Sequence, residues 1–393
     1  MPSALAGLTV LDFTQHLSGP YCAMLLADQG ADVIKIEPPG IGDAARDMPP
    51  FVGKGGTKGR GEGAPFMLWN RNKRSVVLDL KTKQGLADAR ALARSADVLI
   101  ENYRPGVAAR LGLGYRALAR ANKGLIYCSI SGFGQTGPYR DRGGFDLMTQ
   151  AMSGLMATCG DVDGPPHRLP IAISDVAAGM FGAIGVLSAL HARQRTGRGQ
   201  QIDVSLLESA IALQVYEAAY FFATNERPPR LGQAHRGSSP YQMFQTRDGW
   251  ITIGGGTQVF YERLCALLDA KALIDDPRFR TNSDRVCNND ALVAALSGPL
   301  MARTTKHWMT ALGKVGIPAG PVMTHDQVFA DPHVLARDMV VAVDHPVAGR
   351  TRTLDIPVKL SATPGRVGRA APTLGQHTDQ VLRGIKRRAK TAR

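Results

Sequence analysis

The sequence predicts an α/β protein built on a doubly wound parallel sheet, followed by a second, smaller domain. Short apolar strands alternate with helices over the first 131 residues, and parallel strands need such crossover helices. The 393 residues are 44% hydrophobic, which suffices for two or three packed domains. A stretch rich in proline, glycine and polar residues, 225–239, then interrupts the pattern and is typical of a linker.

The elements of the sheet follow one another from the start of the chain. Residues 8–13 predict a buried strand, 19–29 a helix ended by Gly30, and 33–37 a second strand, which together make one βαβ unit. Further strands are expected at 75–80, 98–102, 125–131 and 201–205, and helices at 83–94, 174–193 and 206–224. Ligands of such sheets bind at the carboxyl ends of the strands, so the residues that follow each strand are the candidate contacts.

The helix expected at 174–193 is crowded with small residues, among them Gly179, Gly182 and Gly185. Glycine inside a helix costs up to ~1 kcal/mol relative to alanine. The stripe therefore predicts that a neighbouring element packs very closely against this helix.

After the linker the pattern resumes with shorter elements. A strand is expected at 250–254, helices at 258–268, 290–302 and 305–312, and strands at 340–343 and 353–358. We therefore expect a large domain over 1–224 and a linker with a smaller α+β domain over 225–329.

Composition excludes several classes of protein. The formal net charge of +14 suits anionic ligands, but only 6% of residues are aromatic and no recognition motif occurs, so nucleic acid is not an expected partner. Five scattered cysteines form no C-x-x-C pair and the histidines no H-x-x-x-H, which argues against a disulfide framework and a metal site. No run of about 20 apolar residues and no signal-like start occurs, so we expect a cytoplasmic protein that does not contact a membrane.

Two common site motifs are missing. The turn after the first strand reads TQHLSGP, whereas dinucleotide binding needs G-x-G-x-x-G so that the backbone can approach the pyrophosphate. No serine lies in the G-x-S-x-G turn of the α/β-hydrolases.

Asp175 lies at the start of the small-residue helix. An aspartate there commonly caps the helix, because unpaired backbone N–H groups favour a carboxylate. It also follows an apolar segment and has small neighbours that leave room for a ligand. An ionised, accessible carboxylate held by backbone donors can act as a covalent nucleophile. The residues alone leave both roles open.

Many motifs in one order extend over nearly the whole chain. They are LxGLxVLDF at 5–13, LLADxGADVIKIEP at 25–38, NRNKRS at 70–75, ENYRPG at 101–106, SGFGQTGP at 131–138, TGxGQ at 196–200, GIPxGPV at 316–322 and LGQHT at 374–378. This pattern resembles the family III CoA-transferases of the CaiB/BaiF type. The group includes oxalate, carnitine and dicarboxylate transferases and also α-methylacyl-CoA racemases.

The resemblance implies a fold and a mechanism. It implies an interlocked, ring-like homodimer in which each chain has a large Rossmann-like domain and a small domain, with 330–393 returning to the large one. Asp175 matches the aspartate that attacks an acyl-CoA to form a mixed anhydride and then an enzyme–CoA thioester. No permanently bound cofactor is implied, since coenzyme A enters as a substrate. Carried over by motif, the CoA contacts are Gln15, Leu78, Lys81, Asn102, Tyr103, Arg110 and Arg142. Pro38 departs from members that have arginine there, which puts one phosphate contact in doubt.

Two alternatives remain beside the transferase. A racemase needs an acid and a base on opposite faces of the substrate. The racemases use a histidine directly before an upstream aspartate, paired with the aspartate of the helix and a glutamate in the small domain. Here Phe145 precedes Asp146, and the strand end after Ile253 has no glutamate, so transferase is favoured. A non-catalytic CoA-binding protein is the other alternative.

The expected substrates are an acyl-CoA, with succinyl-CoA as donor, and a small dicarboxylate acceptor. The motif HRGSSPYQ at 235–242 is similar to that of the succinyl-CoA:dicarboxylate members. A carboxylate removed from water needs a cation or several donors, and His235 and Arg236 are the local candidates.

Overall fold

The computed structural model describes residues 2–55, 59 and 61–391. Two compact units divide the chain: 1–155, 168–219 and 332–393 form the first, and 156–167 and 220–331 the second. Residues 156–167, expected in the large domain, group with the second unit. There Arg230 donates hydrogen bonds to the carbonyls of Asp161 (3.1 Å) and Gly164 (2.7 Å), which ties this segment to the chain after residue 219.

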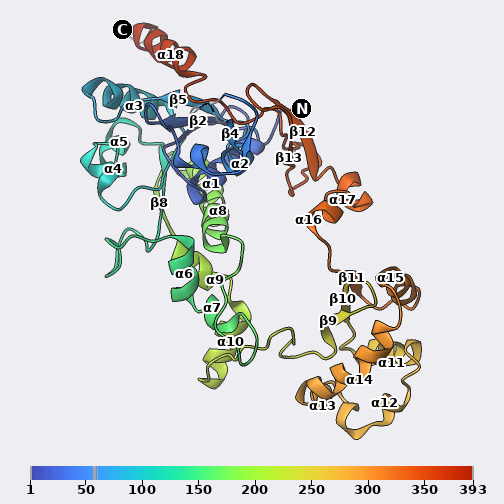
Figure 1. Ribbon diagram of the computed structural model, residues 1–393. Helices are drawn as coiled ribbons and strands as arrows, with labels where there is room; N and C mark the ends of the chain where they lie inside the picture. Colours follow the sequence, from blue (N-terminus) through green and yellow to red (C-terminus); the bar gives the residue numbers. More distant parts are fainter. Residues whose placement is uncertain (1, 56–58, 60, 392–393) are drawn as a thin grey trace. The chain divides into compact units, whose positions relative to one another are not determined.

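The first unit is built on a six-stranded sheet whose described pairings are all parallel (Figure 1). The strand order is β5-β2-β1-β6-β7-β8. The order reverses between β1 and β6, because the chain runs outward from β1 to β5 and then returns to the other side of β1. The strands are β1 (Thr9–Asp12), β2 (Asp32–Glu37), β5 (Arg74–Val77), β6 (Val98–Glu101), β7 (Ile126–Ser131) and β8 (Gln201–Ser205).

Helices cover both faces of this sheet, which confirms the expected doubly wound arrangement. Neighbouring strand residues point to opposite faces, so Val10 joins one core and Leu11 the other. The first core is completed by α1 (Ser18–Asp28) and α8 (Ile173–Thr196), and the second by α3 (Lys83–Ser95) and α5 (Tyr115–Ala121) (Figure 1).

Helix α8 is long and apolar enough to cross a membrane by length and composition, and no other helix in the described residues is. Polar residues near both ends interrupt its apolar run, so the sequence alone did not predict a span. Its buried stripe, which includes Ala178, Gly182 and Val186, packs on α1 and the sheet. Packing inside the unit therefore accounts for much of its composition.

The helix expected at 206–224 is two helices, α9 (Leu206–Ala212) and α10 (Val215–Thr224). The chain tightens at Gln214, whose N–H donates to the Ile211 carbonyl (3.0 Å). Several short elements were also missed, because segments of two to eight residues carry little periodicity. They are η1 (Ala44–Asp47), β3 (Phe51–Val52), β4 (Glu62–Gly63), α2 (Ala64–Trp69), α4 (Val107–Arg110), α6 (Asp146–Ser153) and α7 (Leu155–Thr158).

The second unit packs helices on a three-stranded antiparallel sheet in the order β11-β10-β9. Its core surrounds Phe244, Tyr261 and Trp308. The elements are β9 (Tyr241–Gln245), β10 (Trp250–Gly254), α11 (Gln258–Leu267), α12 (Ala272–Asp275), η2 (Pro277–Phe279), α13 (Asn282–Cys287), α14 (Asn289–Met301), α15 (Thr305–Lys314), β11 (Ala319–Pro321) and α16 (His325–Val328).

The C-terminal segment belongs to the first unit. It contains α17 (Pro332–Ala336), the antiparallel pair β12 (Val340–His345) and β13 (Gly349–Leu354), and α18 (Thr378–Thr391). The Val77 N–H donates to the Thr378 hydroxyl (3.0 Å), which ties the segment to the edge strand β5.

Candidate active site

Asp175 lies in the first turn of α8 but does not cap it. The N-cap is Ala172, which has no side-chain hydrogen bond. Ser18, the first residue of α1, lies beside it instead, and its hydroxyl and backbone N–H lower the pKa of the Asp175 carboxyl group by hydrogen bonding. The carboxylate therefore lies at the N-terminus of a neighbouring helix, where N–H groups lack intrahelical partners and the helix dipole favours negative charge.

Glycine in α8 permits this approach. A Cβ on Gly179 would lie 2.8 Å from the Ser18 carbonyl oxygen and 2.9 Å from Cδ1 of Tyr21, both too close for a real contact. A Cβ on Gly182 would lie 3.0 Å from Sγ of Cys22, which like Ser18 and Tyr21 belongs to α1. The expected close packing against the small-residue stripe is thereby confirmed, and the partner is α1.

Two side chains of α6 fix the chain where it enters α8. Asp146 accepts the Ser174 N–H (2.9 Å) on one oxygen and the side-chain amide of Gln150 (2.8 Å) on the other. The Gln150 side chain also accepts the Leu169 N–H (2.9 Å). Asp146 and Gln150 are buried, so the start of α8 has a fixed position.

The environment of Asp175 raises the pKa of its carboxyl group from 3.8 to about 6. Burial is the largest cause, and the negative charge of Asp146 adds to it, whereas the two hydrogen bonds from Ser18 oppose the shift. At neutral pH the group is ionised, yet it is more basic than an ordinary aspartate. A partly exposed carboxylate of this kind can attack an electrophilic carbonyl carbon.

Two of the expected CoA contacts meet where the strand order reverses. Gln15 follows β1 and Asn102 follows β6. The Gln15 N–H donates to the Asn102 side-chain oxygen (2.9 Å), and the Asn102 amide donates to the Gln15 carbonyl (2.7 Å). The crevice at such a point is where open α/β sheets bind ligands.

The remaining expected CoA contacts lie in the same unit without hydrogen bonds to one another in the described structure. Leu78 is buried at the end of β5 and its N–H donates to the Glu37 carbonyl (3.0 Å). Tyr103 donates its N–H to Glu101 (2.9 Å). Lys81, Arg110 and Arg142 are exposed, and the Arg142 guanidinium lies 3.9 Å from the centroid of the Tyr139 ring.

The expected carboxylate contacts His235 and Arg236 belong to the second unit. His235 lines a cavity of about 740 Å³, together with Tyr241, Gln242 and Thr252. Its ring centroid lies 5.0 Å from that of Tyr241, and the Arg236 guanidinium lies 4.9 Å from the Tyr220 ring.

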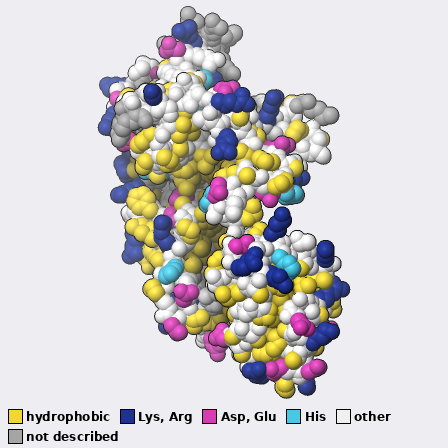
Figure 2. Space-filling model, turned by 45° about the vertical axis from the view of Figure 1, so that its right-hand side comes forward, with side chains coloured by type: hydrophobic (Ala, Val, Ile, Leu, Met, Phe, Trp, Pro, Cys, Tyr) yellow, Lys and Arg dark blue, Asp and Glu magenta, His cyan; other side chains and the backbone are white. Residues whose placement is uncertain are grey.

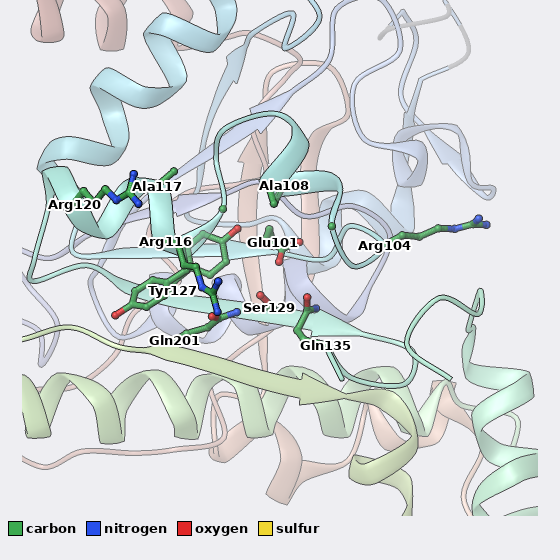
Figure 3. A pocket seen from close by; sticks show the side chains of 14 residues that line it. Glu101, Arg104, Ala108, Arg116, Ala117, Arg120, Tyr127, Ser129, Gln135 and Gln201 are labelled. Atoms are coloured by element: carbon green, nitrogen blue, oxygen red, sulfur yellow. The ribbon is translucent and has the colours of Figure 1, made fainter. Parts of the chain in front are cut away.

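A cavity of about 380 Å³ in the first unit is lined by none of the residues predicted to bind CoA or to react. Figure 3 shows it against β6 and β7, with Glu101 and Ser129 inside and the Arg104 side chain extending away. Burial raises the pKa of Glu101 to about 7, and the hydrogen bond from the Tyr103 N–H (2.9 Å) opposes this shift. The bond from the Tyr103 N–H joins the Glu101 carboxylate to the chain directly after β6.

Ser18 and Asp146 were missed as neighbours of Asp175. Neither lies near Asp175 in the sequence, and a serine before glycine and proline is also an ordinary helix start. The one signal in the sequence was general. A buried carboxylate needs hydrogen-bond donors, and a helix N-terminus supplies them, but the sequence does not indicate which helix this would be.

Comparison with known proteins places the chain in a family. Residues 5–378 match CoA-transferase family III. The chain belongs to that family and is a CoA-transferase.

The relatives extend over nearly the full length. The chain is 38% identical to succinyl-CoA:glutarate CoA-transferase of Mus musculus over 384 residues, covering 98% of this chain and 86% of the relative. It is 42% identical to acetyl-CoA:oxalate CoA-transferase of Acetobacter aceti over 336 residues, covering 85% of each. The crystal structure of a CaiB/BaiF family protein from Brucella suis superposes with a TM-score of 0.89 at 37% identity, covering 98% of this chain and 100% of that one.

Proposed function

We propose that this CoA-transferase moves CoA from succinyl-CoA to a small dicarboxylate, with Asp175 as the nucleophile. The observation that carries the proposal is the position of the Asp175 carboxylate in the first turn of α8, partly exposed, ionised at neutral pH and beside the hydroxyl and N–H of Ser18. The relatives support CoA transfer between an acyl-CoA and a carboxylate.

The first half-reaction forms an acylated enzyme. A carboxylate oxygen of Asp175 attacks the thioester carbonyl carbon, a C–O bond forms, the C–S bond breaks, and CoA leaves as the thiolate. The product is a mixed anhydride of Asp175. The thiolate then attacks the Asp175 carbonyl carbon, which releases the first carboxylate and leaves CoA bound to Asp175 as a thioester.

The second half-reaction reverses these steps with the acceptor. The acceptor carboxylate attacks the Asp175 thioester carbon and expels the CoA thiolate. The thiolate then attacks the acceptor's acyl carbon, which gives the new acyl-CoA and restores the Asp175 carboxylate. No proton is gained or lost, which agrees with a site whose nucleophile is already ionised at neutral pH.

The acceptor is the finer part of the proposal. The mouse relative is named for succinyl-CoA and glutarate. His235 lines a cavity in the second unit, and Arg236, its neighbour in the sequence, is the proposed cation for the acceptor carboxylate. The Acetobacter relative is named for acetyl-CoA and oxalate. Oxalate is therefore the acceptor against which longer dicarboxylates should be compared.

We also propose a homodimer. Apolar side chains of α8 are exposed in the single chain, with 48% of Met180, 55% of Ile184 and 44% of Leu187 accessible. Hydrophobic groups also reach the surface elsewhere (Figure 2). An apolar surface of this kind is typical of an interface. Interlocked chains should sediment as a dimer at every concentration, and reversible dissociation into a folded monomer would contradict the interlocked form.

A donor-by-acceptor panel tests the substrate. Succinyl-CoA, acetyl-CoA and oxalyl-CoA are each paired with those of monocarboxylates, oxalate, succinate and glutarate that differ from the donor's own acid, and the new acyl-CoA is measured by HPLC. We expect dicarboxylates to be the best acceptors with succinyl-CoA, Asp175→Ala and Asp175→Asn to be inactive, and Arg236→Ala to raise the KM of the dicarboxylate. Best turnover with monocarboxylates, together with unchanged dicarboxylate kinetics in Arg236→Ala, would contradict the acceptor assignment.

A further inference from the structure

Two lysines with no exposed surface lie beneath the segment that carries Ser18. Lys35 is in the middle of β2, and Lys73 directly precedes β5. Lysine is almost never fully buried unless it is paired. Both ammonium groups face Asp12 at the end of β1, at 3.7 Å from Lys35 and 2.8 Å from Lys73.

Each lysine holds one end of the turn between β1 and α1. Lys35 donates to the Thr14 carbonyl (2.8 Å), directly after β1. Lys73 donates to the Pro20 carbonyl (2.8 Å), in the first turn of α1. Ser18 lies between these two attachment points.

The backbone between them is fixed by the same cluster. Asp12 accepts the Thr14 N–H (2.9 Å), and Asp43 accepts the His16 N–H (3.0 Å) while its other oxygen lies 2.8 Å from Lys35. His16 has a φ of 65°, which L-residues rarely adopt, so these bonds hold a turn that its own sequence does not favour.

Stability alone gives a weak reason for such a cluster. Buried ion pairs lose solvation and are often replaceable by apolar side chains without loss of stability. The charges of Asp12 and Asp43 outweigh the effect of burial and raise the pKa of Lys35 to about 12, so it stays a cation. A cation here supplies directed hydrogen bonds to the turn, which an apolar side chain cannot.

We infer that Lys35 and Lys73 are positioning residues, which hold the β1–α1 turn so that Ser18 meets the Asp175 carboxylate. This inference rests on the proposed role of Asp175 as the nucleophile. Neither lysine touches the reacting atoms. Their effect reaches the substrate through the backbone of residues 14–20 and the two donors of Ser18.

The test uses Lys35→Met, Lys35→Arg and Asp43→Asn in the full-length protein. Amide hydrogen exchange of residues 14–18 reports the turn, and the rate at which succinyl-CoA with hydroxylamine labels Asp175 reports the nucleophile. We expect faster exchange in the turn, labelling slowed 10- to 100-fold with little change in the KM of succinyl-CoA, and partial rescue by Lys35→Arg. A misplacement of about 1 Å can cost that factor. The labelling rate rises with pH as Asp175 ionises. In Lys35→Met this rise should occur at higher pH, because the Ser18 donors that lower the pKa of Asp175 are displaced while Asp146 still raises it.

Arg71→Met is the matched control. Arg71 is a buried cation of the same unit that pairs with Asp28 at 2.6 Å and donates to no residue of the turn. The Arg71→Met substitution should lower the stability of the protein. It should leave the amide hydrogen exchange of residues 14–18 and the pH profile of Asp175 labelling unchanged.

The outcomes separate the two proposals. A loosened turn with wild-type labelling, an unchanged turn in Lys35→Met, or an equal effect of Arg71→Met overturns the positioning role. Should Lys35→Met fail to fold, Asp43→Asn decides by the same readouts, because it keeps the side-chain shape and removes the charge that faces Lys35. Turnover in Asp175→Ala overturns the nucleophile assignment, whatever the turn does.

Discussion

Replacing Asp175 with asparagine should stabilise the folded protein at pH 8, although it removes the nucleophile. The pKa of Asp175 is raised from 3.8 to about 6 by burial and by Asp146. Between these values the folded chain binds more protons than the unfolded chain, so its free energy of unfolding falls as the pH rises through this window and stays low above it. Asparagine carries no charge and removes this cost.

The magnitude follows from the two pKa values. The difference corresponds to about 3 kcal/mol at pH 8, as an upper limit, and to about half of that at pH 5. The carboxylate is partly exposed, so we expect a gain of about 1–3 kcal/mol at pH 8. Domains of 150–250 residues shift their Tm by about 2–4 °C per kcal/mol, which makes the gain measurable.

Thermal unfolding at equal protein concentration, at pH 5 and pH 8, is the assay. Asp175→Asn should unfold several degrees above the wild type at pH 8 and by roughly half that margin at pH 5. Asp141→Asn, at a side chain that is 81% exposed, should change the Tm little at either pH. Equal margins at the two pH values, or no gain at pH 8, would refute the electrostatic reasoning.

Three further outcomes are expected. The rising limb of kcat/KM against pH should have its midpoint near 6, and Asp146→Asn should move it to lower pH because the charge of Asp146 raises the pKa of Asp175; an upward shift would contradict this. Gly179→Ala should lower the Tm, at a cost of about 1–3 kcal/mol for overpacking against Ser18, whereas Gly313→Ala, with nothing within 4 Å, should not. Asn102→Ala loses both hydrogen bonds to Gln15 and should raise the KM of the acyl-CoA about tenfold while leaving the acceptor KM unchanged; equal kinetics would remove Asn102 from the CoA site.

Periodicity predicted the parallel sheet well because its strands are short apolar runs between helices. The strand at 201–205 in this sheet has the bounds expected for it, as does the strand at 250–254 in the antiparallel sheet of the second unit. Boundaries were weaker where the backbone tightens between two helices, as it does at Gln214 between α9 and α10. Residues 156–167 were assigned to the large domain because their contacts with Arg230 are distant in sequence and leave no local signal.

The site could be predicted only in part for a similar reason. The small-residue stripe of α8 indicated a close neighbour, and the motifs indicated Asp175. The donors that hold its carboxylate come from α1, and the lysines beneath that turn come from β2 and the segment before β5. A lysine inside the apolar strand VIKIE was visible in the sequence, but its partners Asp12 and Asp43 become apparent only when β1 and β2 pair, as the register of Asp12 opposite Lys35 shows.

Trapping of the reacted aspartate tests the central claim most directly. The protein is mixed with succinyl-CoA, treated with hydroxylamine, digested and analysed by mass spectrometry, beside Asp175→Ala treated in the same way. The proposed reaction predicts a hydroxamate on the peptide that contains Asp175, formed only with the thioester present and absent from the variant. Turnover without any modification of Asp175, or a modification that survives in Asp175→Ala, would contradict the claim.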